Sequence, residues 1–177
     1  MTSLFPHSPY AEDQPYARSI LYLHTFRAGA MMGTFISFLT APASLLPARR
    51  SLPVRNPNPL SRPPFTVQLL PRLLIHSSRG LIVGGIFGVA ATFGRMYGRK
   101  EIEWQDRSWR LLENKGEEDT DLVSFGGTAV GAVVGVLAVR RGVNIGMGKA
   151  VLGGAGLGMA AGVPYMMVTF ARGRKPA

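Results

Sequence analysis

The side chains that could carry acid–base or metal chemistry are few and widely separated in this chain. Its 177 residues include three histidines, His7, His24 and His76, and no cysteine. Thiolate zinc sites, iron–sulfur clusters and disulfide scaffolds all require cysteine, so none of them is available here. The histidines are too far apart in the sequence to form a local ligand set. We therefore expect no catalytic residue, no metal site and no cofactor.

Two glycine-rich segments superficially resemble phosphate-binding loops. A P-loop needs a glycine five residues before its last glycine and a hydroxyl residue after the lysine. Around Gly148 and Lys149 these positions hold Val143 and Ala150. The glycines at 154–158 have the wrong spacing for a dinucleotide fingerprint. Nucleotide binding is not expected, and neither is a nucleic acid partner.

The acidic residues are concentrated in one segment. Eight of the ten lie between Glu101 and Asp121. We expect an amphipathic surface helix with Ile102, Trp109 and Leu112 on one face, and then a loop that Asp121 ends as the N-cap of the next helix. No nucleophile accompanies the carboxylates, which favours a solvated face over catalysis. Tryptophan and arginine are common interface anchors, so a second interpretation is docking on a partner subunit through Trp104, Asp106, Trp109 and Arg110.

Long apolar runs must position these segments. Uncharged stretches cover 28–48, 80–94, 122–139 and 150–171, which are 21, 15, 18 and 22 residues long. A helix that crosses the hydrocarbon layer needs about 20 such residues. We predict an all-α, four-helix transmembrane bundle in one membrane domain, 19–173, with a tail at each end, 1–18 and 174–177. Its approximate spans are 19–46, 73–97, 122–140 and 149–171, joined by a Pro/Arg-rich loop at 47–72 and an amphipathic charged loop at 99–121.

A soluble helix bundle is the alternative. Water-soluble helices carry a charged face, whereas 122–139 has no charged residue on any side. Glycine costs about 1 kcal/mol relative to alanine in an exposed helix but lets membrane helices approach closely. The composition therefore favours the membrane.

Glycines recur four residues apart in all four predicted spans. This spacing places them on one helix face, where missing side chains allow close backbone contact. The predicted helix-packing residues are Gly29, Gly33, Gly80, Gly84, Gly88, Gly127, Gly131, Gly135, Gly154, Gly158 and Gly162.

The loop at 47–72 holds seven prolines and no acidic residue. It is expected to be extended. Its arginines could bind anionic lipid or an acidic partner, or the segment could be a solvated linker; both interpretations stay open. The candidate lipid contacts are Arg49, Arg50, Arg55 and Arg62.

Arg27 is the one charge well inside a predicted span. It could line a polar cavity or pair with another subunit. The favoured interpretation is that it reaches the membrane interface from the first turns of the helix.

Four short glycine-striped spans, with an Asn114–Asp121 segment before the third, resemble the Tim family of mitochondrial inner-membrane proteins. This family includes protein-import channels and a four-helix accessory subunit of respiratory complex I. The resemblance covers about residues 19–173. It implies the mitochondrial inner membrane, with both termini and the 99–121 segment in the intermembrane space. The positive-inside rule does not decide the orientation, since both sides carry many basic residues.

The chain departs from the import channels in three ways. It has no cysteine for their disulfide, a longer connection between the first two spans, and no acidic residue in its apolar runs. We therefore expect a non-catalytic accessory subunit that supports assembly or stability of complex I. A component of the inner-membrane import translocase is the alternative.

Overall fold

The computed structural model describes residues 4–46 and 64–172. A short 3-10 turn, η1 (Ala11–Asp13), precedes α1 (Ala17–Ala43), and α3 (Phe65–Met96) follows the 47–63 gap. The shorter α4 (Glu101–Glu113) leads into α5 (Lys115–Arg140). The chain closes with α6 (Met147–Met159) and α7 (Gly162–Ala171). No strand occurs within 4–46 or 64–172, so the described chain is all-α as predicted.

Three helical segments are long and apolar enough to cross a membrane: Val67–Met96, Lys115–Arg140 and Met147–Ala171. They correspond to the second, third and fourth predicted spans, so the protein has the features of a multi-pass membrane protein. The first predicted span forms the 27-residue helix α1 but is not among the three. Arg27 together with several glycine, threonine and serine residues lowers the mean hydropathy of α1.

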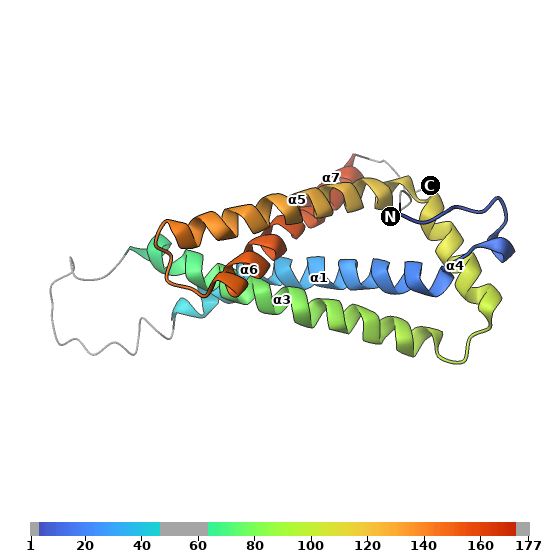
Figure 1. The fold of residues 1–177 in the computed structure, drawn as a ribbon, viewed down its shortest axis with the longest axis horizontal. Coiled ribbons are helices and arrows are strands. Elements are labelled where there is room, and N and C mark those ends of the chain that lie inside the picture. Colours follow the sequence, from blue (N-terminus) through green and yellow to red (C-terminus); the bar gives the residue numbers. More distant parts are fainter. Residues whose placement is uncertain (1–3, 47–63, 173–177) are drawn as a thin grey trace.

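The long helices form two pairs (Figure 1). α1 lies against α3, and α5 lies against α6. The pairs meet where α6 packs across α3 and also touches α1, while α7 continues along α5. The short helix α4 closes one end of the molecule, where it contacts α1, η1 and the start of α5.

The second predicted span begins earlier than expected. α3 begins at Phe65, eight residues before the predicted start, so part of the predicted loop is helical; Pro64 occupies its N-cap. Residues 47–63 of that loop, including Arg49, Arg50, Arg55 and Arg62, lie outside the described residues.

The last span is interrupted rather than continuous. α6 ends at Met159 and α7 begins at Gly162. Pro164 has no N–H to donate to the carbonyl of Ala160, four residues earlier, and a proline ring clashes with that carbonyl in a regular helix. Val163 donates to Ala160 instead, at 3.1 Å, in a tighter turn. The interruption therefore has a local cause in the sequence.

Candidate functional site

Backbones of α1 and α3 touch directly at their glycines. A Cβ added to Gly29 would overlap the carbonyl oxygen of Gly84, and one added to Gly33 would overlap that of Gly80. At Gly88 the overlap would be with the carbonyl oxygen of Thr25. No side chain fits between the helices at these positions, so alanine would push the helices apart.

The α5–α6 pair uses the same kind of contact. A Cβ on Gly127 would meet the carbonyl of Gly158, and one on Gly131 would meet that of Gly154. Gly135 faces the backbone of Ala150. Of the eleven predicted packing glycines, Gly162 differs, because it faces side chains of Ser124 and Met31 rather than a backbone.

Two glycines that the four-residue spacing did not select join the pairs to each other. Gly153 of α6 lies against the backbone of Leu74 in α3, and Gly156 lies against Ser77 and Thr34. They are on a second face of α6, next to the Gly154 and Gly158 face. A search for small residues on two adjacent faces of one helix could have found them.

A buried ion cluster connects α1 to α5. The Arg27 side chain is only 2% exposed, and its Nη2 lies 2.6 Å from Oε2 of Glu117. Its Nε lies 2.5 Å from Oδ1 of Asp121, which is itself 5% exposed. Nδ1 of His24 is 3.3 Å from the same Nη2. The expectation that Arg27 reaches the interface is therefore wrong: it is buried and pairs with two carboxylates of its own chain.

The first turns of α5 explain how Glu117 and Asp121 come to face Arg27. Asn114, not Asp121, is the N-cap: its Oδ1 accepts from the backbone N–H of Gly116 at 3.0 Å and of Glu117 at 3.4 Å. Asparagine satisfies free N–H groups of a first turn as well as aspartate does. The predicted loop is thus helical from Lys115, and Glu117 and Asp121, four residues apart, share the face toward α1.

The cluster is suited to holding helices together. One guanidinium between two carboxylates satisfies charges that would be costly to bury alone. No group of three or more His, Cys, Asp and Glu side chains that could hold a metal occurs among the described residues.

α4 is fixed to the N-terminal part of the chain. Trp104 is buried with Ala17 and Met96, and the Arg18 guanidinium lies 5.5 Å from its ring centroid. Nε1 of Trp109 donates to the carbonyl of Ser8 at 2.9 Å. The buried face of α4 is Trp104, Ser108 and Leu112, four residues apart, whereas Ile102, which was expected on it, is exposed.

The four predicted docking residues therefore fall into two groups. Trp104 and Trp109 contact their own chain, and the ring of His7 stacks on Trp109 at 5.5 Å. Asp106 and Arg110 form a solvent-facing pair, 3.0 Å apart. Of the four, Trp104 is buried, whereas Asp106 and Arg110 face solvent.

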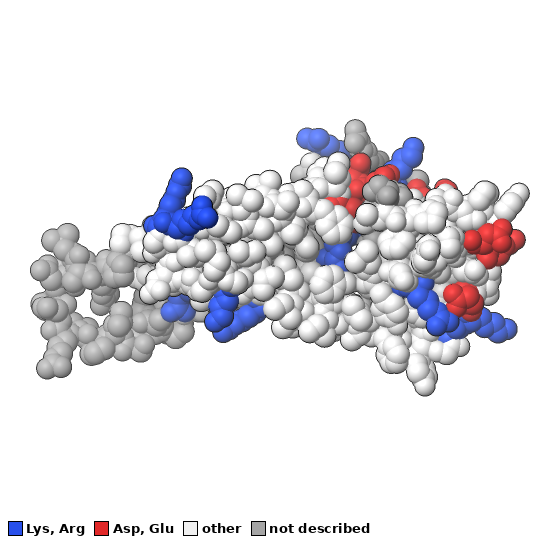
Figure 2. Space-filling model, in the orientation of Figure 1, with Lys and Arg blue, Asp and Glu red and all other residues white. Residues whose placement is uncertain are grey.

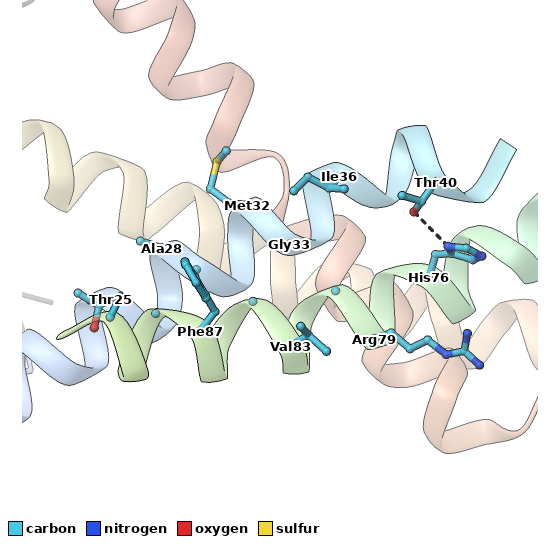
Figure 3. Close-up of a pocket in the computed structure, with 15 residues that line it drawn as sticks. Thr25, Ala28, Met32, Gly33, Ile36, Thr40, His76, Arg79, Val83 and Phe87 are labelled. Carbon is cyan, nitrogen blue, oxygen red and sulfur yellow. Dashed lines mark hydrogen bonds between the residues drawn. The ribbon is translucent and has the colours of Figure 1, made fainter. Parts of the chain in front are cut away.

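A groove of about 880 Å³ runs along the outer side of the α1–α3 pair (Figure 3). Glycines of both helices form its floor, and the side chains of Met32, Ile36, Val83 and Phe87 stand beside it. Near one end, Nδ1 of His76 and Oγ1 of Thr40 are 3.0 Å apart. The sequence did not predict this groove, because it forms only where two glycine faces meet.

No family model matches the chain, and no curated protein or solved structure is significantly similar to it.

Proposed function

We propose that this chain is a non-catalytic protein of the mitochondrial inner membrane with four crossing helices, and that it supports the assembly or stability of respiratory complex I as an accessory subunit. The proposal rests on the resemblance of its glycine pattern to the Tim family. The geometry supports it through the way the helices pack and through the apolar surface they leave uncovered.

This uncovered surface is the structural observation that carries the membrane part of the proposal. Ile86 and Phe87 of α3 are 62% and 72% exposed, and Val130 and Val133 of α5 are 66% and 60% exposed. Soluble monomers rarely expose contiguous apolar surface of this kind. Such faces suit lipid tails and the apolar helices of neighbouring subunits.

α1 is the proposed fourth crossing helix. It lies alongside α3 from the Gly29–Gly84 contact to the Thr40–His76 contact. Beyond them, Nη1 of Arg72 donates to the Ser44 carbonyl at 3.1 Å. Because α1 and α3 lie side by side over this length, both would occupy the same membrane layer. The charge of Arg27, which lowers the hydropathy of α1, is neutralised by the ion cluster.

The buried Asp121 keeps the import translocase as a second candidate. Absence of acidic residues from the apolar runs favoured the accessory role. Asp121 is nevertheless buried inside α5, within the candidate span Lys115–Arg140. That reason for preferring complex I is therefore weaker in the folded chain than in the sequence.

Native-gel migration of a tagged copy in mild-detergent extracts of mitochondria, with mass spectrometry of its band, tests the proposal. Co-migration with complex I subunits, together with reduced complex I when the chain is deleted, is the expected result. Co-migration with import subunits and blocked precursor uptake would select the translocase. A small isolated band would contradict both assignments.

Replacing Gly131 by Leu tests the packing part of the proposal. The side chain would enter the contact with Gly154, whereas a Cβ on Gly126 meets nothing within 4 Å. We expect Gly131→Leu to lower the abundance of the chain and of its complex, and Gly126→Leu to leave both near normal. Equal abundance of the two variants and of their complexes would contradict a role for the glycine face of α5 in packing.

A further inference from the structure

The α1–α3 groove has a floor that no side chain of this protein fills. Its central lining residues are Gly29 and Gly33 of α1 with Gly80, Gly84 and Gly88 of α3. Their backbones already touch, so the groove cannot close further by helix movement. α6 packs against the same helix pair elsewhere, and nothing among the described residues covers the groove.

The walls and length of the groove match a single hydrocarbon chain. Met32, Ile36, Val83 and Phe87 flank the floor, and all four side chains are at least 45% exposed. On α3 the lining runs from His76 to Ala91. Its part from Arg79 to Ala91 is about 18 Å long at 1.5 Å per residue, close to the roughly 15 Å depth of one hydrocarbon leaflet.

One end of the groove is cationic. Arg79 is the only charged side chain among its lining residues, and none of the ion pairs found in the described part of the chain involves it. Figure 3 shows its side chain extending toward His76, away from Phe87. Arg72 lies two turns earlier on the same helix, where it donates to Ser44. Long basic side chains place their charge at headgroup level in this way.

We propose that the groove binds one anionic phospholipid of the surrounding bilayer, with an acyl chain on the glycine floor and the phosphate at Arg79. A neutral apolar helix would gain nothing from the single cation, whereas a phosphate forms a charge-assisted hydrogen bond with arginine. The proposal does not depend on which complex the chain joins.

Native mass spectrometry of the purified full chain tests the site. The chain is reconstituted in vesicles of equal phosphatidylglycerol and phosphatidylcholine with identical acyl chains, and then released in mild detergent. We expect one phosphatidylglycerol to be retained in preference to phosphatidylcholine. Arg79→Gln should reduce that preference about fivefold, as expected for one basic residue near a membrane surface. Arg95→Gln, on the same helix but outside the groove, should not.

A second variant tests the acyl chain position without disturbing the glycine contacts. Ala28 lines the groove but is not one of the contact glycines, so Ala28→Phe should fill it and remove the bound lipid. Val133→Phe places the same side chain on an exposed face of α5 and should retain the lipid. Circular dichroism confirms that each variant is folded.

Four results would overturn the proposal. Equal retention of both lipids would exclude recognition of the phosphate, and an Arg79→Gln effect no larger than that of Arg95→Gln would exclude Arg79 as its ligand. If Ala28→Phe changes the oligomeric mass while phosphatidylglycerol stays bound, the groove holds a helix instead. A chain with Arg49, Arg50, Arg55 and Arg62 all replaced by Gln should still retain the groove lipid; loss there would place the lipid on that segment.

Discussion

Arg27 shows how one residue can decide the arrangement of distant helices. Its guanidinium joins α1 to two acids that lie ninety or more positions later in the chain. Removing one partner of a buried ion pair is costly because it leaves an uncompensated charge in a medium of low polarity. The cluster therefore fixes where α5 meets α1.

Arg27→Gln should lower the free energy of unfolding by about 3 kcal/mol, because the buried Asp121 and the half-buried Glu117 would lose their cation. Thermal unfolding in a fixed detergent measures the loss. Arg18→Gln is the matched control: its pair with Glu101 is exposed, and such pairs contribute about 1 kcal/mol or less. A triple variant with Arg27→Gln, Glu117→Gln and Asp121→Asn should recover part of the loss. Similar losses for the Arg27 and Arg18 variants would contradict the role of the cluster.

Glycines of α1 and α3 provide a second comparison between single residues. Gly29→Ala should destabilise the protein by about 1–3 kcal/mol, as overpacking does, because its Cβ would overlap the Gly84 carbonyl. Gly94→Ala meets nothing within 4 Å, so it should be neutral or stabilise by up to about 1 kcal/mol through helix propensity. The test is to measure and compare the unfolding temperatures of the two variants in the same detergent. The packing argument fails if Gly29→Ala is as stable as Gly94→Ala.

Among the elements, α4 depends most on its neighbours. It is short, polar outside and attached through Trp104 on one side and Trp109 on the other. The N-terminal segment is itself held in shape, since the buried Gln14 donates to the carbonyls of Pro6 at 2.8 Å and Pro15 at 3.0 Å. α4 and the N-terminal segment therefore form one unit at this end of the molecule.

Trp104→Ala should release this unit, because removing a buried tryptophan costs about 3 kcal/mol or more. Limited proteolysis in detergent should cut α4 at least about tenfold faster than in the unmodified chain, since cleavage follows the population of the opened form. Arg110→Ala removes an exposed side chain of the same helix and should leave the rate nearly unchanged. Unaltered cleavage in the Trp104 variant would show that α4 is held by other contacts.

In the described part of the molecule, acidic residues gather at one end, whereas basic residues occur at both ends (Figure 2). The acidic residues visible in Figure 2 gather at the end formed by α4 and the start of α5. The far end carries basic residues of the α5–α6 connection and the start of α6, Arg140, Arg141 and Lys149. The apolar helices between these ends form the layer that a bilayer would cover.

This arrangement predicts which positions share a side of the membrane. The chain has no cysteine, so single cysteines can be introduced at the exposed positions Glu12, Glu113 and Arg141. In sealed membrane vesicles, a membrane-impermeant maleimide should label Glu12→Cys and Glu113→Cys from one side and Arg141→Cys from the other. Labelling of all three from the same side would rule out the crossing of α5.

The sequence by itself determined the class of the molecule. Helix formation and membrane burial depend on local composition, so the uncharged runs identified α3, α5 and the last span, and the four-residue glycine spacing identified contact faces before any partner was known. It also contained the Asn114 cap and the Pro164 break, both of which are local signals. The end of α5 at Arg140 was predicted correctly for the same reason.

Only the tertiary structure decided which faces meet. The sequence alone placed Glu117 and Asp121 in a solvated loop, because their partner, Arg27, lies on another helix that is distant in the chain. The sequence alone suggested that Trp104 and Trp109 dock on another protein, because the N-terminal segment that contacts them is distant in the chain. The lipid groove exists only where the glycine faces of α1 and α3 are brought together. Pairing between distant segments depends on the sum of many weak contacts across the fold, and no local pattern specifies that sum.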